Sequence, residues 1–149
     1  MHIYVDADAC PKVIKEILFR AVKRTGLRMT IVANKPLYTP ESDLIDKLIV
    51  PGGYNMADEK IIELVQDGDL VITADIPLAA AVIEKGATAL NPRGTVYTEN
   101  NIGPILGMRN LMDELRSSGI ETGGPSAFGK KDRETFANAL NTLINTHTN

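Results

Sequence analysis

Residues 69–94 read DLVITADIPLAAAVIEKGATALNPRG, and this stretch decides the fold. An apolar run at 70–73 precedes a helical pattern at 77–85, and a second apolar run follows at 88–90. A strand, a helix and a second strand in this order predict a right-handed crossover between parallel strands. Because neither run alternates apolar with polar residues, we expect both strands to be buried on both faces of a sheet.

The same alternation extends through the rest of the chain. Three further apolar runs predict strands at residues 3–5, 29–33 and 48–50. Helical patterns occupy residues 12–25, 56–66, 98–118 and 130–144, a polar connection occupies residues 35–47, and residues 145–149 are expected to fray. The sequence therefore predicts one domain over residues 1–149, of the α/β class, with three layers (α/β/α) and a mainly parallel sheet of roughly five strands.

Composition excludes several classes of protein. The 149 residues are 44% hydrophobic, which suits one substantial core, and the net charge of −3 argues against a generally basic nucleic-acid-binding protein. A single cysteine, Cys10, excludes an internal disulfide and a cysteine zinc site. Because the apolar runs are short and no signal peptide is visible, we expect a cytoplasmic protein without a membrane segment. The absence of a Walker A or GxGxxG pattern predicts no nucleotide cofactor.

Polar residues follow most of the predicted strands at the point where each strand ends. These residues are Asp6 and Asp8, Asn34 and Lys35, Thr73 and Asp75, and Asn91 and Arg93. The carboxyl ends of parallel strands lie along one edge of the sheet, where ligands of such folds usually bind. Asp58, near the start of the next helix after residues 48–50, is expected at the same edge.

Clustered carboxylates without histidine or cysteine are the oxygen ligands that Mg²⁺ or Mn²⁺ prefers. We therefore predict a Mg²⁺ or Mn²⁺ site made by Asp6, Asp8, Asp58 and Asp75. Such an ion can activate a water and stabilise a leaving oxygen, which suits phosphoryl chemistry. Each aspartate also has a structural interpretation, because each precedes or opens a predicted helix and could cap it.

Charge is distributed unevenly, and this bears on the substrate. Residues 12–35 hold seven Lys or Arg and one acid, whereas residues 41–75 hold nine acids and two lysines. A basic flank beside an acidic metal pocket suits a phosphodiester backbone, so RNA is the expected partner, although the lack of tryptophan offers little for base stacking. The residues predicted to bind or orient substrate are Asn34, Lys35, Thr73, Asn91, Arg93 and Arg109.

Four strings of the chain closely resemble the YaiI/YqxD family of small bacterial proteins. They are IYVDADACP from residue 3, DLVITADIPLAAAVIEKGA from residue 69, ALNPRG from residue 89 and TGGP from residue 122. The resemblance covers nearly the whole chain. It places the protein near the PIN-like nucleases, which implies a parallel sheet flanked by helices and an acidic pocket that uses Mg²⁺ or Mn²⁺ to cleave phosphodiesters, mostly in RNA.

The resemblance also implies roles for individual residues. Asp6 resembles the PIN aspartate that ends the first strand, Asp58 (or Glu59) the acid on a central helix, and Asp75 the aspartate after the fourth strand. These three are the predicted catalytic residues. The fourth PIN acid has no counterpart after Asp75, and Asp8 is the residue that would compensate.

Two other functions fit the sequence. Asp6 and Asp8 form a DxD pattern, which in haloacid-dehalogenase-type phosphatases supplies a nucleophile and an acid/base. The chain could also be a non-catalytic module that binds RNA or protein and has kept a PIN-like shell. The leading expectation is a metal-dependent phosphodiesterase of the ribonuclease type.

Overall fold

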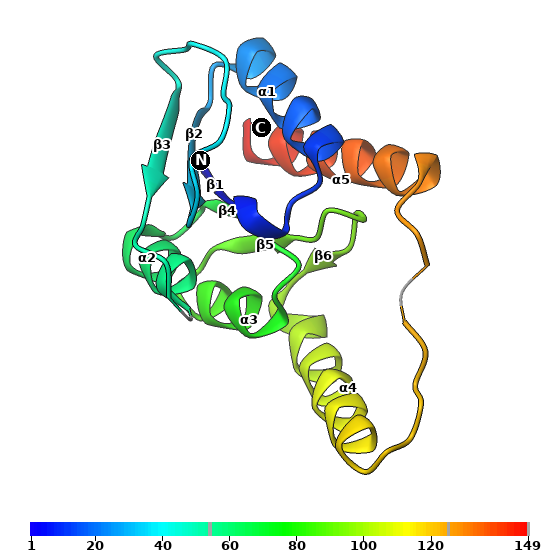
Figure 1. Ribbon diagram of the computed structural model, residues 1–149. Coiled ribbons are helices and arrows are strands. Elements are labelled where there is room, and N and C mark those ends of the chain that lie inside the picture. Colours follow the sequence, from blue (N-terminus) through cyan, green and yellow to red (C-terminus); the bar gives the residue numbers. More distant parts are fainter. Residues whose placement is uncertain (54, 125, 149) are drawn as a thin grey trace.

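A computed structural model describes residues 1–53, 55–124 and 126–148 of the chain. The strands are β1 (His2–Asp6), β2 (Arg28–Ala33), β3 (Ile45–Ile49), β4 (Leu70–Ile72), β5 (Thr88–Leu90) and β6 (Val96–Tyr97). The helices are η1 (Ala7–Ala9, a 3₁₀ turn), α1 (Lys12–Thr25), α2 (Met56–Leu64), α3 (Ile76–Glu84), α4 (Glu99–Ser117) and α5 (Lys130–Thr148). Figure 1 shows these elements in chain order.

The strands form one sheet in the order β3-β2-β1-β4-β5-β6, parallel except for the antiparallel pair of β5 and β6. Alternate residues along the central strands enter two separate cores. Ile3 and Val5 pack with α1 and α5, whereas Tyr4 between them packs with α2 and α3. The central strands are apolar throughout because helices cover both of their faces. The predicted three-layer α/β architecture is confirmed.

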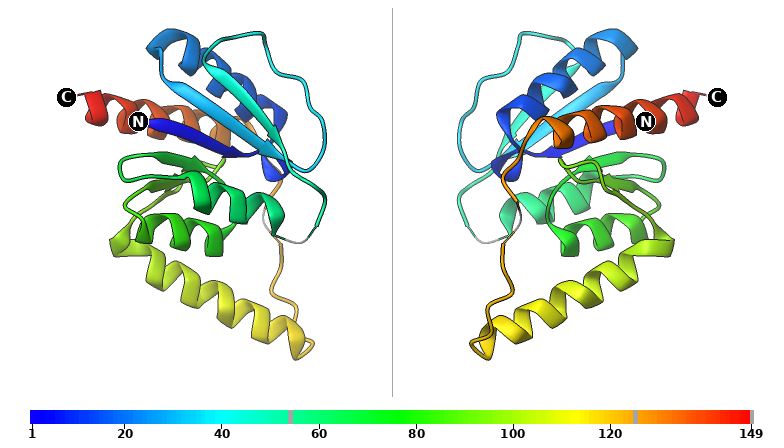
Figure 2. Two further views of the ribbon diagram at one scale, coloured as in Figure 1. Left: turned by 90° about the vertical axis from the view of Figure 1, so that its left-hand side faces the viewer. Right: turned by 90° about the vertical axis from the view of Figure 1, so that its right-hand side faces the viewer.

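Helix α4 differs from the others because none of its residues is fully buried. Its first half packs on α3 through Ile102 and Ile105, and its second half extends away from the body of the molecule (Figures 1 and 2). Residues 118–124 follow α4, and residues 126–129 lead into α5 in the opposite layer (Figure 2). Within the described residues, none of the helices has the length and apolar character needed to cross a bilayer.

The structure corrects the sequence prediction at three places. β3 lies at Ile45–Ile49 rather than 48–50, and this shortens the predicted 35–47 connection. The sheet has a sixth strand, β6, which pairs back on β5 after the turn at residues 91–95. Helix α5 continues to Thr148, beyond its predicted end at 144, so residues 145–148 are helical, and Asn149 lies outside the described residues.

Candidate functional site

Asp6 ends β1 at the carboxyl edge of the sheet, and it is a buried carboxylate with only 7% of its surface exposed. The hydroxyl of Thr73, just after β4, donates to Asp6 Oδ2 over 3.0 Å. Burial raises the pKa of Asp6, the Thr73 hydrogen bond opposes that rise, and the charges of Asp75 and Asp8 add to it. Thr73 therefore orients a carboxylate that the fold holds at an energetic cost.

Asp75 is fixed two residues later by the start of α3. Its Oδ1 accepts from the amide of Leu78 over 2.9 Å, which makes Asp75 the N-cap of that helix. Its own amide donates to the Thr73 hydroxyl over 2.9 Å, so Thr73 links Asp75 to Asp6. The capping interpretation of Asp75 is confirmed, and the cap places the carboxylate beside the end of β1.

Asp58 is brought to the same place by the first turn of α2. Burial, followed by the charges of Asp75 and Asp6, raises the pKa of Asp58 to about 6. The side chain of Asp75 is the neighbouring group with the largest effect on that pKa. Carboxylates from the end of β1, the first turn of α2 and the N-cap of α3 thus interact electrostatically at the carboxyl edge of the sheet.

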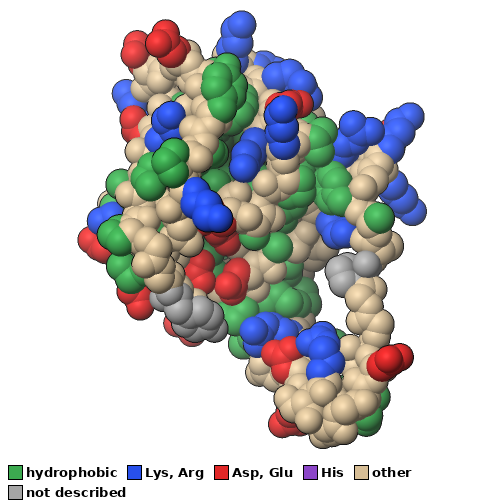
Figure 3. Space-filling model, in the orientation of Figure 1, with side chains coloured by type: hydrophobic (Ala, Val, Ile, Leu, Met, Phe, Trp, Pro, Cys, Tyr) green, Lys and Arg blue, Asp and Glu red, His purple; other side chains and the backbone are tan. Residues whose placement is uncertain are grey.

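The acidic cluster (Asp6, Asp58 and Asp75) has no ion-pair partner among the residues that the structure describes. Figure 3 shows acidic side chains gathered at the centre of the face seen in Figure 1, with Lys and Arg side chains around them. Uncompensated, partly buried carboxylates of this kind favour either a shared proton or a bound cation.

A tight, complete set of metal ligands is not formed by these side chains. No group of three or more Asp, Glu, His or Cys residues within the described ranges is arranged to hold a metal ion. Asp58 and Asp75, whose carboxylates interact electrostatically, are the residues that could contact a cation that keeps several of its waters, which is the usual habit of Mg²⁺ in proteins. Asp6 is more deeply buried and would act on such a cation through its charge.

Asp8 does not lie on the same strand face as Asp6, because β1 ends at Asp6 and the chain turns into η1. Asp8 Oδ2 instead accepts from the amide of Asn34 over 2.8 Å, so it ties the end of β2 to η1. The Asn34 side-chain oxygen is buried without a hydrogen-bond partner in the described structure. Lys35 beside it is exposed.

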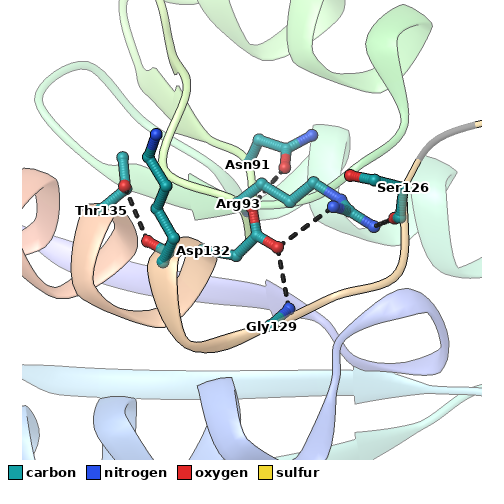
Figure 4. A network of polar contacts seen from close by, with 7 residues as sticks. Asn91, Arg93, Ser126, Gly129, Asp132 and Thr135 are labelled. Atoms are coloured by element: carbon teal, nitrogen blue, oxygen red, sulfur yellow. Dashed lines mark hydrogen bonds and ion pairs between the residues drawn. The ribbon is translucent and has the colours of Figure 1, made fainter.

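Asn91 and Arg93 stabilise the turn that follows β5. The Asn91 side chain accepts from the Arg93 amide over 2.7 Å and donates to the Tyr97 hydroxyl over 2.9 Å. The Arg93 guanidinium pairs with Asp132 of α5 over 3.2 Å and donates to the carbonyl of Ser126 (Figure 4). These contacts give both residues a structural role. Asp132 is the partner that sequence reasoning missed, because it lies 39 positions away.

Arg109 lies on the exposed second half of α4. It forms an ion pair with Asp113 over 3.3 Å, and Asp113 also pairs with Arg116 over 2.7 Å. No contact between Arg109 and the acidic cluster is present in the described structure. The only cysteine, Cys10, is buried, and its burial raises the pKa of the thiol to about 12, which suits packing rather than nucleophilic chemistry.

Comparison with known proteins places the chain among close relatives. Residues 4–146 match the family described as "Uncharacterized BCR, YaiI/YqxD family". A UPF0178 protein of Hydrogenovibrio crunogenus is 58% identical over 144 residues, covering 97% of this chain and 95% of the relative. The UPF0178 protein YE1167 of Yersinia enterocolitica is 59% identical over 140 residues, covering 94% and 92%. No solved structure matches the chain. The chain belongs to the YaiI/YqxD (UPF0178) family.

Proposed function

We propose that the protein is a divalent-metal-dependent phosphodiesterase that acts on RNA. The observation that carries this proposal is the acidic cluster, in which burial, together with the neighbouring charge of Asp75, raises the pKa of Asp6 and of Asp58 at the ligand-binding edge of a parallel sheet. No cation of the described chain offsets their charge. A fold that holds such a cluster does so at the expense of stability, and this is typical of a functional site.

The residues of the cluster would have different roles in the reaction. Asp58 and Asp75 would hold Mg²⁺ or Mn²⁺, and the ion would supply an activated water and withdraw charge from the phosphorus. Asp58 must first release its proton, which at a pKa of about 6 happens readily at neutral pH. The Thr73 hydroxyl fixes the Asp6 carboxylate, and the start of α3 keeps Asp75 in place.

The phosphatase alternative finds less support in the geometry. In the DxD arrangement the second aspartate must be free to give and take a proton near the nucleophile. Asp8 instead accepts a hydrogen bond from the Asn34 amide, and Asp6 is nearly inaccessible at 7% exposure. The non-catalytic alternative predicts RNA binding without turnover, and the following test separates it from the proposal.

The test is hydrolysis of labelled single-stranded and structured RNA in Mn²⁺, in Mg²⁺ and in EDTA. We compare the wild type with Asp75→Asn, which can still cap α3 through its amide oxygen, and with Asp132→Asn as a matched control purified in parallel. We expect metal-dependent cleavage by the wild type and the control, and loss of cleavage by Asp75→Asn. Equal cleavage by all three, or binding without cleavage, would overturn the proposal.

A further inference from the structure

A cleft on the outer side of α1 combines positive charge with an exposed aromatic ring. It lies between α1 and the segment that follows β2, and it has a volume of about 630 Å³. Lys12, Lys15 and Arg20 line one wall, opposed by a single acid, Glu16. Leu37 and Tyr38 line the other wall. Phe19 of α1 adds an apolar surface to the first wall. The size is that of a small-molecule or single-nucleotide site.

Tyr38 is the unusual residue of this cleft because 82% of its surface is exposed. It is not at the tip of a loose loop. The preceding residue, Leu37, packs against the core cluster under α1, and its carbonyl accepts from the Lys47 ammonium of β3 over 3.3 Å. The backbone beside Tyr38 is therefore anchored, and the Tyr38 ring is left open to solvent, where a planar ligand could stack on it.

Both walls of the cleft are connected along the chain to the acidic edge. Lys12 opens α1 just after η1, which itself follows Asp6, and Leu37 lies three residues after Asn34, whose amide binds Asp8. In Figure 3, Lys and Arg side chains lie between the central acidic side chains and the upper part of the face, where Figure 1 shows α1 and the segment after β2. A polyanion that reached the acidic cluster would meet these cations next.

We propose that this cleft binds a nucleotide of single-stranded RNA adjacent to the bond at the acidic cluster. Its base would stack on Tyr38 against the apolar wall, and its phosphates would contact Lys12, Lys15 and Arg20. A base inside a duplex has no free face, so stacking selects a single strand. The position relative to the bond that is cleaved rests on the proposed function, whereas binding itself needs no metal.

The experiment is fluorescence anisotropy of the full chain with a labelled 12-nucleotide RNA, single-stranded or annealed, in EDTA. Tyr38→Ala should weaken binding of the single strand about tenfold, as expected for one stacked base, while Tyr38→Phe keeps the ring and stays within about twofold of wild type. Lys12→Ala/Lys15→Ala should reduce the salt dependence of binding by a slope of about 1.4. Lys60→Ala on α2, a lysine already paired with Glu63, is the control and should change nothing.

The outcomes separate this inference from the proposed function. Unchanged binding by Tyr38→Ala, equal affinity of the wild type for single and double strands, or no RNA binding by the wild type would each overturn the inference. Loss of binding in Tyr38→Ala without any Mn²⁺-dependent cleavage by the wild type would support the cleft and contradict the hydrolase. If the wild type cleaves RNA and Tyr38→Ala binds RNA as tightly as the wild type, the hydrolase is supported and the cleft is contradicted.

Discussion

Two groups of charged side chains lie at the ends of the parallel strands, and they differ in how their charge is balanced. After β5, the carboxylate of Asp132 has a counter-charge from Arg93 and a hydrogen bond from the Gly129 amide. After β1 and β4, the acidic cluster has neighbours of its own sign and no partner cation among the described residues. The first arrangement stabilises the fold, whereas the second weakens it and favours a ligand.

Asp6→Asn is expected to have the largest effect of the changes that test this comparison. The amide can still accept the Thr73 hydrogen bond, so the fold should survive, but a charge next to the proposed cation is lost. We expect kcat/KM for RNA hydrolysis to fall by about 100-fold or more, on the scale of other single electrostatic contributions. Asp132→Asn, measured beside it, should keep the wild-type rate, and equal losses in both variants would end the distinction between the two groups.

In the turn after β5, beside the Arg93–Asp132 pair, Gly94→Ala should be the most destabilising single change. Gly94 has a φ of +101°, and an added Cβ would lie 2.4 Å from Thr135 Cγ2 and 2.8 Å from the Thr135 carbonyl carbon. Strain and overlap together should cost about 3 kcal/mol in the free energy of unfolding, measured by urea titration. Gly52→Ala, where the space is open, should change it by less than about 0.5 kcal/mol, and similar values for both would contradict this account of the turn.

Arg93→Ala removes the counter-charge itself. Because Asp132 is largely shielded and Arg93 also lies over the Phe128 ring, we expect a loss of about 1–2 kcal/mol in the free energy of unfolding. The control is Arg116→Ala, which breaks an exposed pair with Asp113 and should cost less than about 0.5 kcal/mol. A larger loss in the control would mean that the pair at Arg93 is no better than a surface contact.

Asp58→Asn should act in the opposite direction and stabilise the protein at neutral pH. The folded-state pKa of Asp58 is raised, so the folded protein keeps a proton that the unfolded chain releases, and stability falls as pH rises from about 4 to about 6. The carboxyl group is partly exposed to solvent, so we expect a gain on the order of 1 kcal/mol at pH 7. Thermal melts at pH 4 and pH 7 check this, and a destabilised variant at pH 7 would show that the cluster is not under strain.

The central sheet and the convergence of Asp6, Asp58 and Asp75 were predictable because both follow from local pattern. Uninterrupted apolar runs mark strands buried on both faces, and their carboxyl ends must share an edge. β3 was harder to place because it is an edge strand whose Asp46 and Lys47 face solvent, which breaks the apolar run.

Other features depend on contacts that no local pattern contains. The two-residue strand β6 is too short for periodicity to reveal, although the turn at Gly94 between apolar residues was a usable signal. Asp8 was predicted to be a metal ligand together with Asp6 because both follow the first strand, whereas the 3₁₀ turn directs it to the Asn34 amide. The pairing of Arg93 with Asp132 arises only when α5 docks beside the end of β5.

The central claim is that the uncompensated carboxylates are a cation site, and calorimetric titration of Mn²⁺ at pH 7 tests it most directly. The wild type and Asp132→Asn should show the same saturable binding, while the folded double variant Asp6→Asn/Asp75→Asn should show none. Equal binding by all three proteins, or no binding by the wild type, would contradict the account and leave Asp75 a helix cap.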